Sequence, residues 1–196
     1  MTAFADLLDL RTAVVEQVGR ADIVDVFPRL VKLAEANFNR NIRTKAQITT
    51  TTLTFASGVA ALPADFAEAI GLYNARGYEY VQQPVQATQI TDGTRYFYSI
   101  AGSNITVNGH DGDLTLQYYA TLPTITDSMT DTNWLLTKYP GAYLYGVSLE
   151  AAKHLRDAEM AKAYAALLRQ ELDDLSADDF RVRYARARVR VQGVTP

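Results

Sequence analysis

The sequence contains no cysteine, and this absence removes several classes of chemistry. A chain without cysteine has no disulfide framework, no thiol nucleophile and no zinc site built on thiolates. Long apolar runs are also missing, since no stretch approaches the roughly 18 residues of a membrane-spanning helix. The N-terminus lacks a basic stretch followed by an apolar run, so we expect no signal peptide. We therefore expect a soluble protein that is not exported and that contacts no membrane.

The sequence also lacks the short motifs of common catalytic and nucleotide-binding sites. It has no G-x-G-x-x-G, no Walker loop and no G-x-S-x-G elbow. Its two histidines leave one catalytic hypothesis, in which His154 and Asp157, one helical turn apart, ligate a metal or form an acid–base pair. A surface or interface histidine explains this pair more simply. We therefore expect no enzyme, no cofactor and no metal, and keep a small hydrolase or metal enzyme as the weakest alternative.

The segment 108–113, Asn-Gly-His-Asp-Gly-Asp, carries side chains that can bind a metal. It does not match the calcium-loop pattern, which needs a bidentate acid about six residues further on. Position 118 is a tyrosine. A hairpin turn accounts for the glycines and the aspartates without any metal.

Charge is distributed unevenly along the chain. A net charge of −3 argues against broad nucleic-acid binding by the whole surface. Near the C-terminus an acidic block from Glu171 to Asp179 precedes a basic one. The basic block contains Arg181, Arg183, Arg186, Arg188 and Arg190, and no acid follows Asp179. The helix dipole favours acid before base, but five arginines exceed that need, so we interpret the block as aimed at an acidic protein surface or a nucleic-acid backbone.

A strand-like tail follows these arginines, because Val189, Val191 and Val194 are separated by polar or small residues. Isolated strands are unstable, so such a tail frays or adds to the sheet of another chain. Arg40 and Arg43 form a smaller basic feature, one turn apart at the end of a predicted helix. They favour a contact with an anion or a partner carboxylate, or alternatively a solvated helix C-terminus where arginine suits the dipole.

A chain of 196 residues with 48% hydrophobic content can bury a core of its own as one domain, or one domain plus an arm. Helical periodicity within 1–44 and 132–180, and β-branched alternation between them, predict a single α+β domain over residues 1–180. We expect a helical bundle, formed by an N-terminal helix pair and C-terminal helices, with a small antiparallel β-sheet of five to seven strands inserted at 45–131. Residues 181–196 are predicted to form an extended C-terminal arm.

Local signals place several helix ends. Thr2, Asp22 and Thr132 are expected to cap helices, and Gly19 is expected to end the first one. Pro28 either kinks the second helix or marks the start of its regular part. One long amphipathic helix is predicted through Leu175, where its apolar stripe stops.

Several segments together resemble the head-to-tail adaptor (connector) proteins of tailed bacteriophages, of the kind found beneath the portal of short-tailed phages. The similarity runs from about residue 20 to about residue 180. Its segments are Glu35-Ala36-Asn37-Phe38-Asn39-Arg40-Asn41-Ile42-Arg43, Leu62-Pro63-Ala64-Asp65-Phe66, Tyr118-Tyr119-Ala120-Thr121-Leu122-Pro123, Thr132-Asn133-Trp134-Leu135-Leu136, Tyr143-Leu144-Tyr145-Gly146 and His154-Leu155-Arg156-Asp157.

The resemblance implies a structural virion protein of the head–tail neck, assembled in the host cytoplasm. Proteins of that family form a homo-oligomeric ring, usually a dodecamer, between the portal and the tail or nozzle protein, and a C-terminal arm reaches the portal. A passing contact with the genomic DNA stays open, and so does the alternative of another neck component, a stopper or a tail terminator. The basic features and the tail described above predict the partner-binding residues, which are Arg40, Arg43, Arg181, Arg183, Arg186, Arg188, Val189, Arg190, Val191 and Val194.

Overall fold

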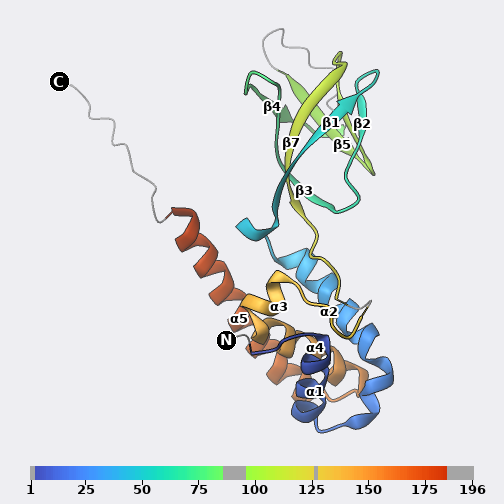
Figure 1. Cartoon of the computed structure of the whole chain (residues 1–196), viewed down its shortest axis with the longest axis vertical. Helices are drawn as coiled ribbons and strands as arrows, with labels where there is room; N and C mark the ends of the chain where they lie inside the picture. Colours follow the sequence, from blue (N-terminus) through green and yellow to red (C-terminus); the bar gives the residue numbers. More distant parts are fainter. Residues whose placement is uncertain (1–2, 86–95, 126–127, 185–196) are drawn as a thin grey trace, which may run out of the picture. The chain divides into compact units, whose positions relative to one another are not determined.

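The computed structural model describes residues 3–85, 96–125 and 128–184, and it divides the chain into two compact units. A helical unit contains residues 1–45 and 122–196, and a sheet unit contains residues 46–121 (Figure 1). Each unit has an apolar core built from its own buried side chains. The chain therefore passes from one unit to the other twice, near residues 45 and 122.

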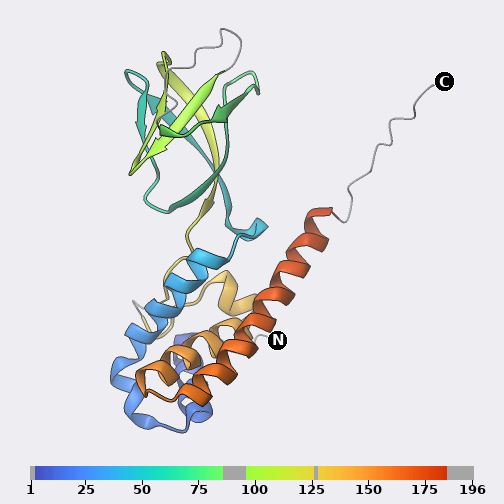
Figure 2. The same ribbon diagram turned by 180° about the vertical axis from the view of Figure 1, so that it is seen from behind.

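The helical unit is built from five α-helices and a 3₁₀ turn among the described residues (Figure 2). They are α1 (Leu7–Val18), η1 (Ala21–Val26), α2 (Phe27–Asn41), α3 (Trp134–Lys138), α4 (Pro140–His154) and α5 (Ala158–Tyr184); a further 3₁₀ turn, η2 (Lys45–Gln47), lies at the junction with the sheet unit. Among these described helices, none is both long and apolar enough to cross a membrane.

The start of α1 is fixed by Asp6, whose Oδ1 accepts hydrogen bonds from the N–H groups of Leu8 and Asp9. Such a cap satisfies donors that have no partner inside the helix. Thr2, the predicted cap, lies outside the described residues. The predicted end at Gly19 is confirmed, because Gly19 adopts φ 69° and donates its N–H to the carbonyl of Val15. Glycine is the residue that tolerates this left-handed conformation most easily.

The second helix begins later than the predicted cap at Asp22. Residues 21–26 form the 3₁₀ turn η1, and α2 starts at Phe27 with Pro28 in its first turn. Proline is tolerated there because the first N–H groups of a helix have no intrahelical partner. Pro28 therefore marks the start of the regular helix, which was one of the two interpretations of this residue.

The third helix is capped by Asn133 instead of Thr132, since Asn133 Oδ1 accepts from the N–H groups of Leu135 and Leu136. The predicted long helix is α5, and Leu175 is the last residue of its buried stripe among the described residues. Residues 181–184 continue α5 as helix, so the predicted arm does not begin in an extended form, and its remainder lies outside the described residues.

The sheet unit contains seven strands among the described residues, in the spatial order β1-β7-β3-β4-β5-β6-β2. They are β1 (Ile48–Phe55), β2 (Val59–Ala61), β3 (Phe66–Tyr73), β4 (Glu79–Gln82), β5 (Phe97–Ala101), β6 (Asn104–Val107) and β7 (Gly112–Ala120). All neighbours are antiparallel except β4 and β5, which run parallel.

The predicted fold class, a helical bundle with a small inserted antiparallel sheet, is wrong. The seven strands curl into a nearly closed, barrel-like sheet. The two strands at the ends of the spatial order, β1 and β2, follow one another in the chain, and a bridge between Ala56 and Val59 joins their facing ends. Closure shortens the exposed edges that an open sheet would present. Alternation in the sequence predicts strands, but it carries no information on which strands close the sheet.

Strand β7 contributes alternate side chains to the core of the sheet unit. Leu114, Leu116 and Tyr118 point inward and are buried, as the period of two in a strand requires. The hairpin interpretation of residues 108–113 is wrong, because β6 and β7 are not neighbours in the sheet. The turn itself exists, with Gly109 at φ 69°, and it leads the chain from β6 to β7, which lies between β1 and β3.

We predict that Gly146→Ala lowers the free energy of unfolding. A Cβ at this position would lie 2.6 Å from Cζ of Phe38, and Phe38 is itself buried in the core. Overpacking costs about 1–3 kcal/mol, against a gain in helix propensity of about 1 kcal/mol. Chemical denaturation measures the net loss.

Gly141→Ala is the matched control in the same helix. A Cβ there meets the carboxylate of Glu171, which lies at the end of a flexible side chain and can turn away. We expect this variant to be as stable as the wild type or slightly more stable. Equal stability of Gly146→Ala and wild type would contradict the packing of α4 described above.

Candidate functional site

A buried carboxylate lies at the centre of the helical unit. Glu35 on α2 is 5% exposed. Its Oε2 accepts a hydrogen bond of 2.8 Å from Thr124 Oγ1, and its Oε1 accepts from the N–H of Ile125 and the hydroxyl of Tyr143, each at 3.0 Å. These donors come from the loop after residue 121 and from α4. One side chain thus holds three segments that are distant in the sequence.

Asn133 extends this network on its other side. Its Nδ2 donates to the hydroxyl of Tyr143 and to the carbonyl of Pro123, each at 2.7 Å, while its Oδ1 caps α3. The ring of Tyr143 packs edge-on against Phe38 with centroids 5.2 Å apart. Both polar atoms of the Asn133 side chain are therefore satisfied, as buried polar groups require.

Burial raises the pKa of Glu35 above its ordinary value, and the hydrogen bonds from Thr124, Ile125 and Tyr143 oppose this shift only in part. The pKa of the Tyr143 hydroxyl is also raised, first by burial and then by the negative charge of Glu35. Burial is the largest cause of both pKa shifts, because a charge is less stable away from water.

A second polar cluster joins the ends of α2 and α5. The guanidinium of Arg43 donates to the carbonyls of Asn39 and Ile42, each at 2.7 Å, and so satisfies the carboxyl end of α2. Asp179 on α5 accepts from the backbone N–H of Lys45 at 2.7 Å and pairs with Arg183 at 2.6 Å. Arg183 in turn donates to the carbonyl of Arg43 at 3.4 Å. We call these four residues, Arg43, Lys45, Asp179 and Arg183, the α2–α5 clamp.

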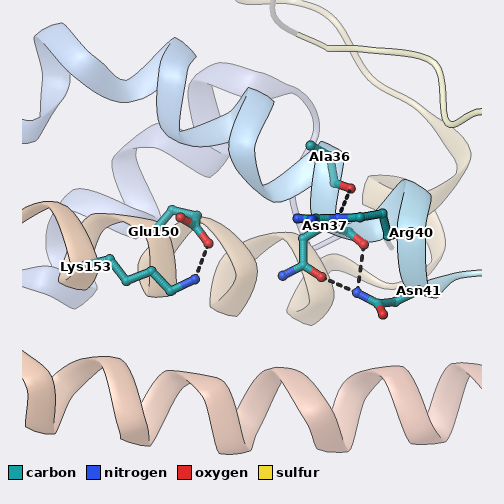
Figure 3. Close-up of polar contacts among 6 residues, drawn as sticks. All are labelled: Ala36, Asn37, Arg40, Asn41, Glu150 and Lys153. Carbon is teal, nitrogen blue, oxygen red and sulfur yellow. Dashed lines mark hydrogen bonds and ion pairs between the residues drawn. The ribbon is translucent and has the colours of Figure 1, made fainter.

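Arg40 and Arg181 lie outside this clamp and are exposed. The Nε of Arg40 donates to the carbonyl of Ala36 on its own helix, beside a similar contact of Asn41 with Asn37 (Figure 3). Arg181 pairs with Asp178 at 3.1 Å, but its side chain remains 76% exposed. Both guanidiniums can therefore reach a partner with little rearrangement.

The structure thus brings Arg43 and Arg183 together and leaves Arg40 and Arg181 separate. The other residues predicted to bind a partner lie outside the described residues. They are Arg186, Arg188, Val189, Arg190, Val191 and Val194.

The catalytic alternative gains no support from the geometry. Asp157 Oδ1 accepts from the N–H of Met160, so this carboxylate caps the start of α5. In the turn at residues 108–113, Asp111 accepts from the N–H of Gly58, and Asp113 accepts from Thr54. In the described parts of the chain, no group of three or more His, Asp or Glu residues could hold a metal ion.

Sequence reasoning missed the roles of Glu35 and Asp179. A signal for Glu35 was present, because this carboxylate lies inside the apolar stripe of α2, between Ala34 and Phe38. A charge at such a position needs a partner. Asp179 gave no comparable signal, since it belongs to an acidic block that suits an exposed helix equally well.

A comparison with protein families matches residues 5–192 of this chain to the SU10 adaptor protein family. The chain belongs to the SU10 adaptor protein family. This match confirms the resemblance to phage head-to-tail adaptors that the sequence motifs carry. A search of curated proteins found no match.

Membership of an adaptor family implies a viral structural protein without a catalytic role. The structure gives a physical explanation for three of the segments that carry the family resemblance. Glu35, Asn133 and Tyr143 each lie in one of them, and together these three residues form the buried network of the helical unit. These motif residues therefore have a role in the fold, and they need not mark a reaction.

We predict that Glu35→Ala destabilises the adaptor strongly and that Glu35→Gln does so mildly. Alanine removes three hydrogen bonds and leaves the buried donors of Ile125 and Tyr143 unpaired, at about 1–3 kcal/mol for each of these two donors. Glutamine keeps a carbonyl acceptor for Ile125 and Tyr143, and we expect a loss of about 1 kcal/mol. Chemical denaturation at neutral pH measures both losses.

The pH dependence of the same pair tests the charge of Glu35. Because the folded-state pKa is raised, the folded state holds its proton more tightly than the unfolded state does. The stability of the wild type relative to Glu35→Gln should therefore be highest below the unfolded pKa of about 4.3 and fall as pH rises through the folded pKa. A difference that stays flat or rises with pH would contradict a destabilising burial of the carboxylate.

We predict that Asp179→Ala loosens the α2–α5 clamp without unfolding the adaptor. Amide exchange should become faster at Lys45 and in residues 180–183, because the acceptor of the Lys45 N–H and the partner of Arg183 are both lost. The free energy of unfolding should fall by about 1 kcal/mol or less, as expected for a partly exposed pair. Asp178→Ala is the control and should leave Lys45 protected.

Proposed function

We propose that this adaptor forms a ring in the neck of a phage virion, between the portal and the tail. The observation that carries the proposal is the family match over residues 5–192, together with the basic block at the end of α5. The ring would seal the packaged genome and present a platform for the tail. Its subunits would be copies of this chain, as a dodecamer in keeping with the resemblance described above.

Contact with the portal would involve the arginines of the α2–α5 clamp and the two exposed arginines beside it in the sequence. We assign Arg40 and Arg181 to direct contacts, because both are exposed in the described part of the chain. Arg43 and Arg183 would serve the same surface from a fixed position, since each also satisfies backbone carbonyls. Charges at the edge of an interface mainly raise the association rate and fix the register.

The segment 185–196 would complete this surface. Arg186, Arg188 and Arg190 would meet acidic groups of the portal or of a neighbouring subunit, and Val189, Val191 and Val194 would add as a strand or pack in a groove. Strand addition supplies main-chain hydrogen bonds. Ordering such a segment costs roughly 1–2 kcal/mol per residue in backbone entropy, which the valines and arginines must offset.

Exposed apolar side chains at the end of α5 support the proposal that a protein binds there. Phe180 is 63% exposed and Val182 is 61% exposed, and both lie next to Arg181. Aromatic residues and arginine are enriched at protein interfaces relative to the rest of the surface. We therefore include Phe180 and Val182 in the proposed portal surface, although the sequence did not single them out.

We predict that removing residues 185–196 abolishes docking to the purified portal protein and leaves the melting temperature almost unchanged. This cut keeps all of α5 and the clamp, whereas a cut at residue 181 also removes Arg183. The proposal fails if the shortened adaptor still docks with wild-type affinity. Docking to the tail protein alone, with no portal binding by the full chain, would favour a stopper or a tail terminator.

Charge-reversal variants test the contribution of each exposed arginine of this surface separately. Arg40→Glu and Arg181→Glu should each weaken portal docking most at low salt, because salt screens exposed charges. Lys162→Glu is the control, since Lys162 is an exposed residue of α5 far in sequence from the basic block. Equal effects of all three reversals would indicate a general charge effect and contradict the assigned surface.

A further inference from the structure

The sheet unit contains a hollow of about 700 Å³, within the size range of sites for small ligands, roughly 300–1,000 Å³. It is formed by residues 74–81 together with Tyr96, His110 and Asp113. Nothing in the proposed portal surface uses these residues, because they all belong to the sheet unit.

Three tyrosine rings line this hollow, and two of them are open to solvent. Tyr78 is 62% exposed and Tyr96 is 56% exposed. Behind them Tyr80 is buried, and its ring lies 5.0 Å from that of Tyr96, tilted by 32°. The buried ring supports the exposed one, so Tyr96 offers a flat aromatic face of defined orientation.

The loop that carries Tyr78 is held in a fixed shape. Asn74 Oδ1 accepts from the N–H groups of Arg76 and Tyr78, at 2.9 and 3.0 Å. Gly77 adopts φ 80°, which closes the turn without strain at this residue type. A ligand that contacts Tyr78 therefore meets a surface that needs little reordering, and this reduces the cost of binding.

The charged groups of the hollow point to a neutral ligand. Glu79 and Asp113 carry negative charge and Arg76 carries positive charge. The two carboxylates disfavour a phosphate or a nucleic acid, and the guanidinium offsets part of their negative charge. All three side chains are nevertheless good hydrogen-bonding groups for hydroxyls, as donors or acceptors.

His110 adds an unsatisfied polar atom to the wall. Its Nε2 is buried and has no hydrogen-bond partner among the described residues, while its ring packs edge-on against Phe55 and Tyr80 at 6.1 Å. A buried polar atom without a partner is unfavourable. A ligand hydroxyl that reaches this nitrogen would satisfy it in either tautomer, because a hydroxyl both donates and accepts.

We propose that this hollow binds a neutral saccharide. A pyranose ring presents C–H bonds on one face, which suit the electron-rich face of a tyrosine, and hydroxyls around its edge, which suit the carboxylates, the guanidinium and His110. Tyr78 and Tyr96 supply the stacking faces, and Glu79 and Asp113 accept from the hydroxyls.

The test uses the isotope-labelled full chain and four neutral probes: methyl β-D-glucopyranoside, methyl β-D-galactopyranoside, methyl α-D-mannopyranoside and N-acetylglucosamine. At least one should shift the amide resonances of residues 74–81 with a dissociation constant on the order of 1 mM, as a small open site allows. Tyr78→Ala and Tyr96→Ala should weaken that binding ten-fold or more. Val59→Ala, an exposed residue of β2 outside the hollow, should leave it unchanged.

Two further probes distinguish the class of ligand. Glucuronate, which is anionic, should bind more weakly than the neutral sugar, and Glu79→Gln should reduce this difference. The proposal is overturned if none of the neutral sugars shifts residues 74–81, or if both tyrosine variants bind as the wild type does. Binding of acetyl-Gly-Arg-Gly-amide without any sugar binding would also overturn it, in favour of a peptide surface. Portal docking should be unaffected in every variant, so failure here does not affect the proposed neck function.

Discussion

The hydrogen bonds of the Glu35 carboxylate are the interaction on which the helical unit depends. They join α2 to Thr124 and Ile125 and to α4 through Tyr143, and Asn133 extends the same network to the start of α3. A buried carboxylate is not an efficient source of stability, because burial disfavours its charge. The hydrogen bonds of Glu35 are directional, and they fix the path of the chain where it re-enters the helical unit. An apolar contact would not do so. Asn39 has a similar role, accepting from the N–H of Leu122 at 2.7 Å.

The α2–α5 clamp gives the adaptor a defined point from which its basic segment starts. Asp179 holds both the N–H of Lys45 and the guanidinium of Arg183, so the last turns of α5 keep their place although the apolar stripe has ended at Leu175. A partner that binds Phe180 and Arg181 then meets an ordered helix end, and pre-ordering of this kind reduces the cost of association. In the proposed portal surface, neighbouring arginines would divide the structural and the binding roles between them. Arg43 satisfies the end of α2, while Arg40 one turn earlier remains exposed.

Much of the local structure could be predicted from the sequence. The apolar stripe of α2, the stop at Gly19 and the alternation of Leu114, Leu116 and Tyr118 each follow from one segment alone. The closure of the sheet did not follow, because it depends on pairings between distant strands, such as β3 with β7, that no local pattern encodes. For the same reason the roles of Glu35 and Asp179 were missed. Their partners lie about 90 and 134 positions away in the sequence, and a single sequence does not reveal which segments meet.

The measurement that tests the adaptor function most directly is electron microscopy of the purified chain, alone and mixed with its portal protein. The account predicts monomers or weak associations in the first sample. In the second it predicts rings of this chain seated coaxially on the portal, because the proposed contact surface binds that partner. Portal particles that remain bare at a saturating concentration of the chain would contradict the account, and so would a stable dimer that persists with and without portal.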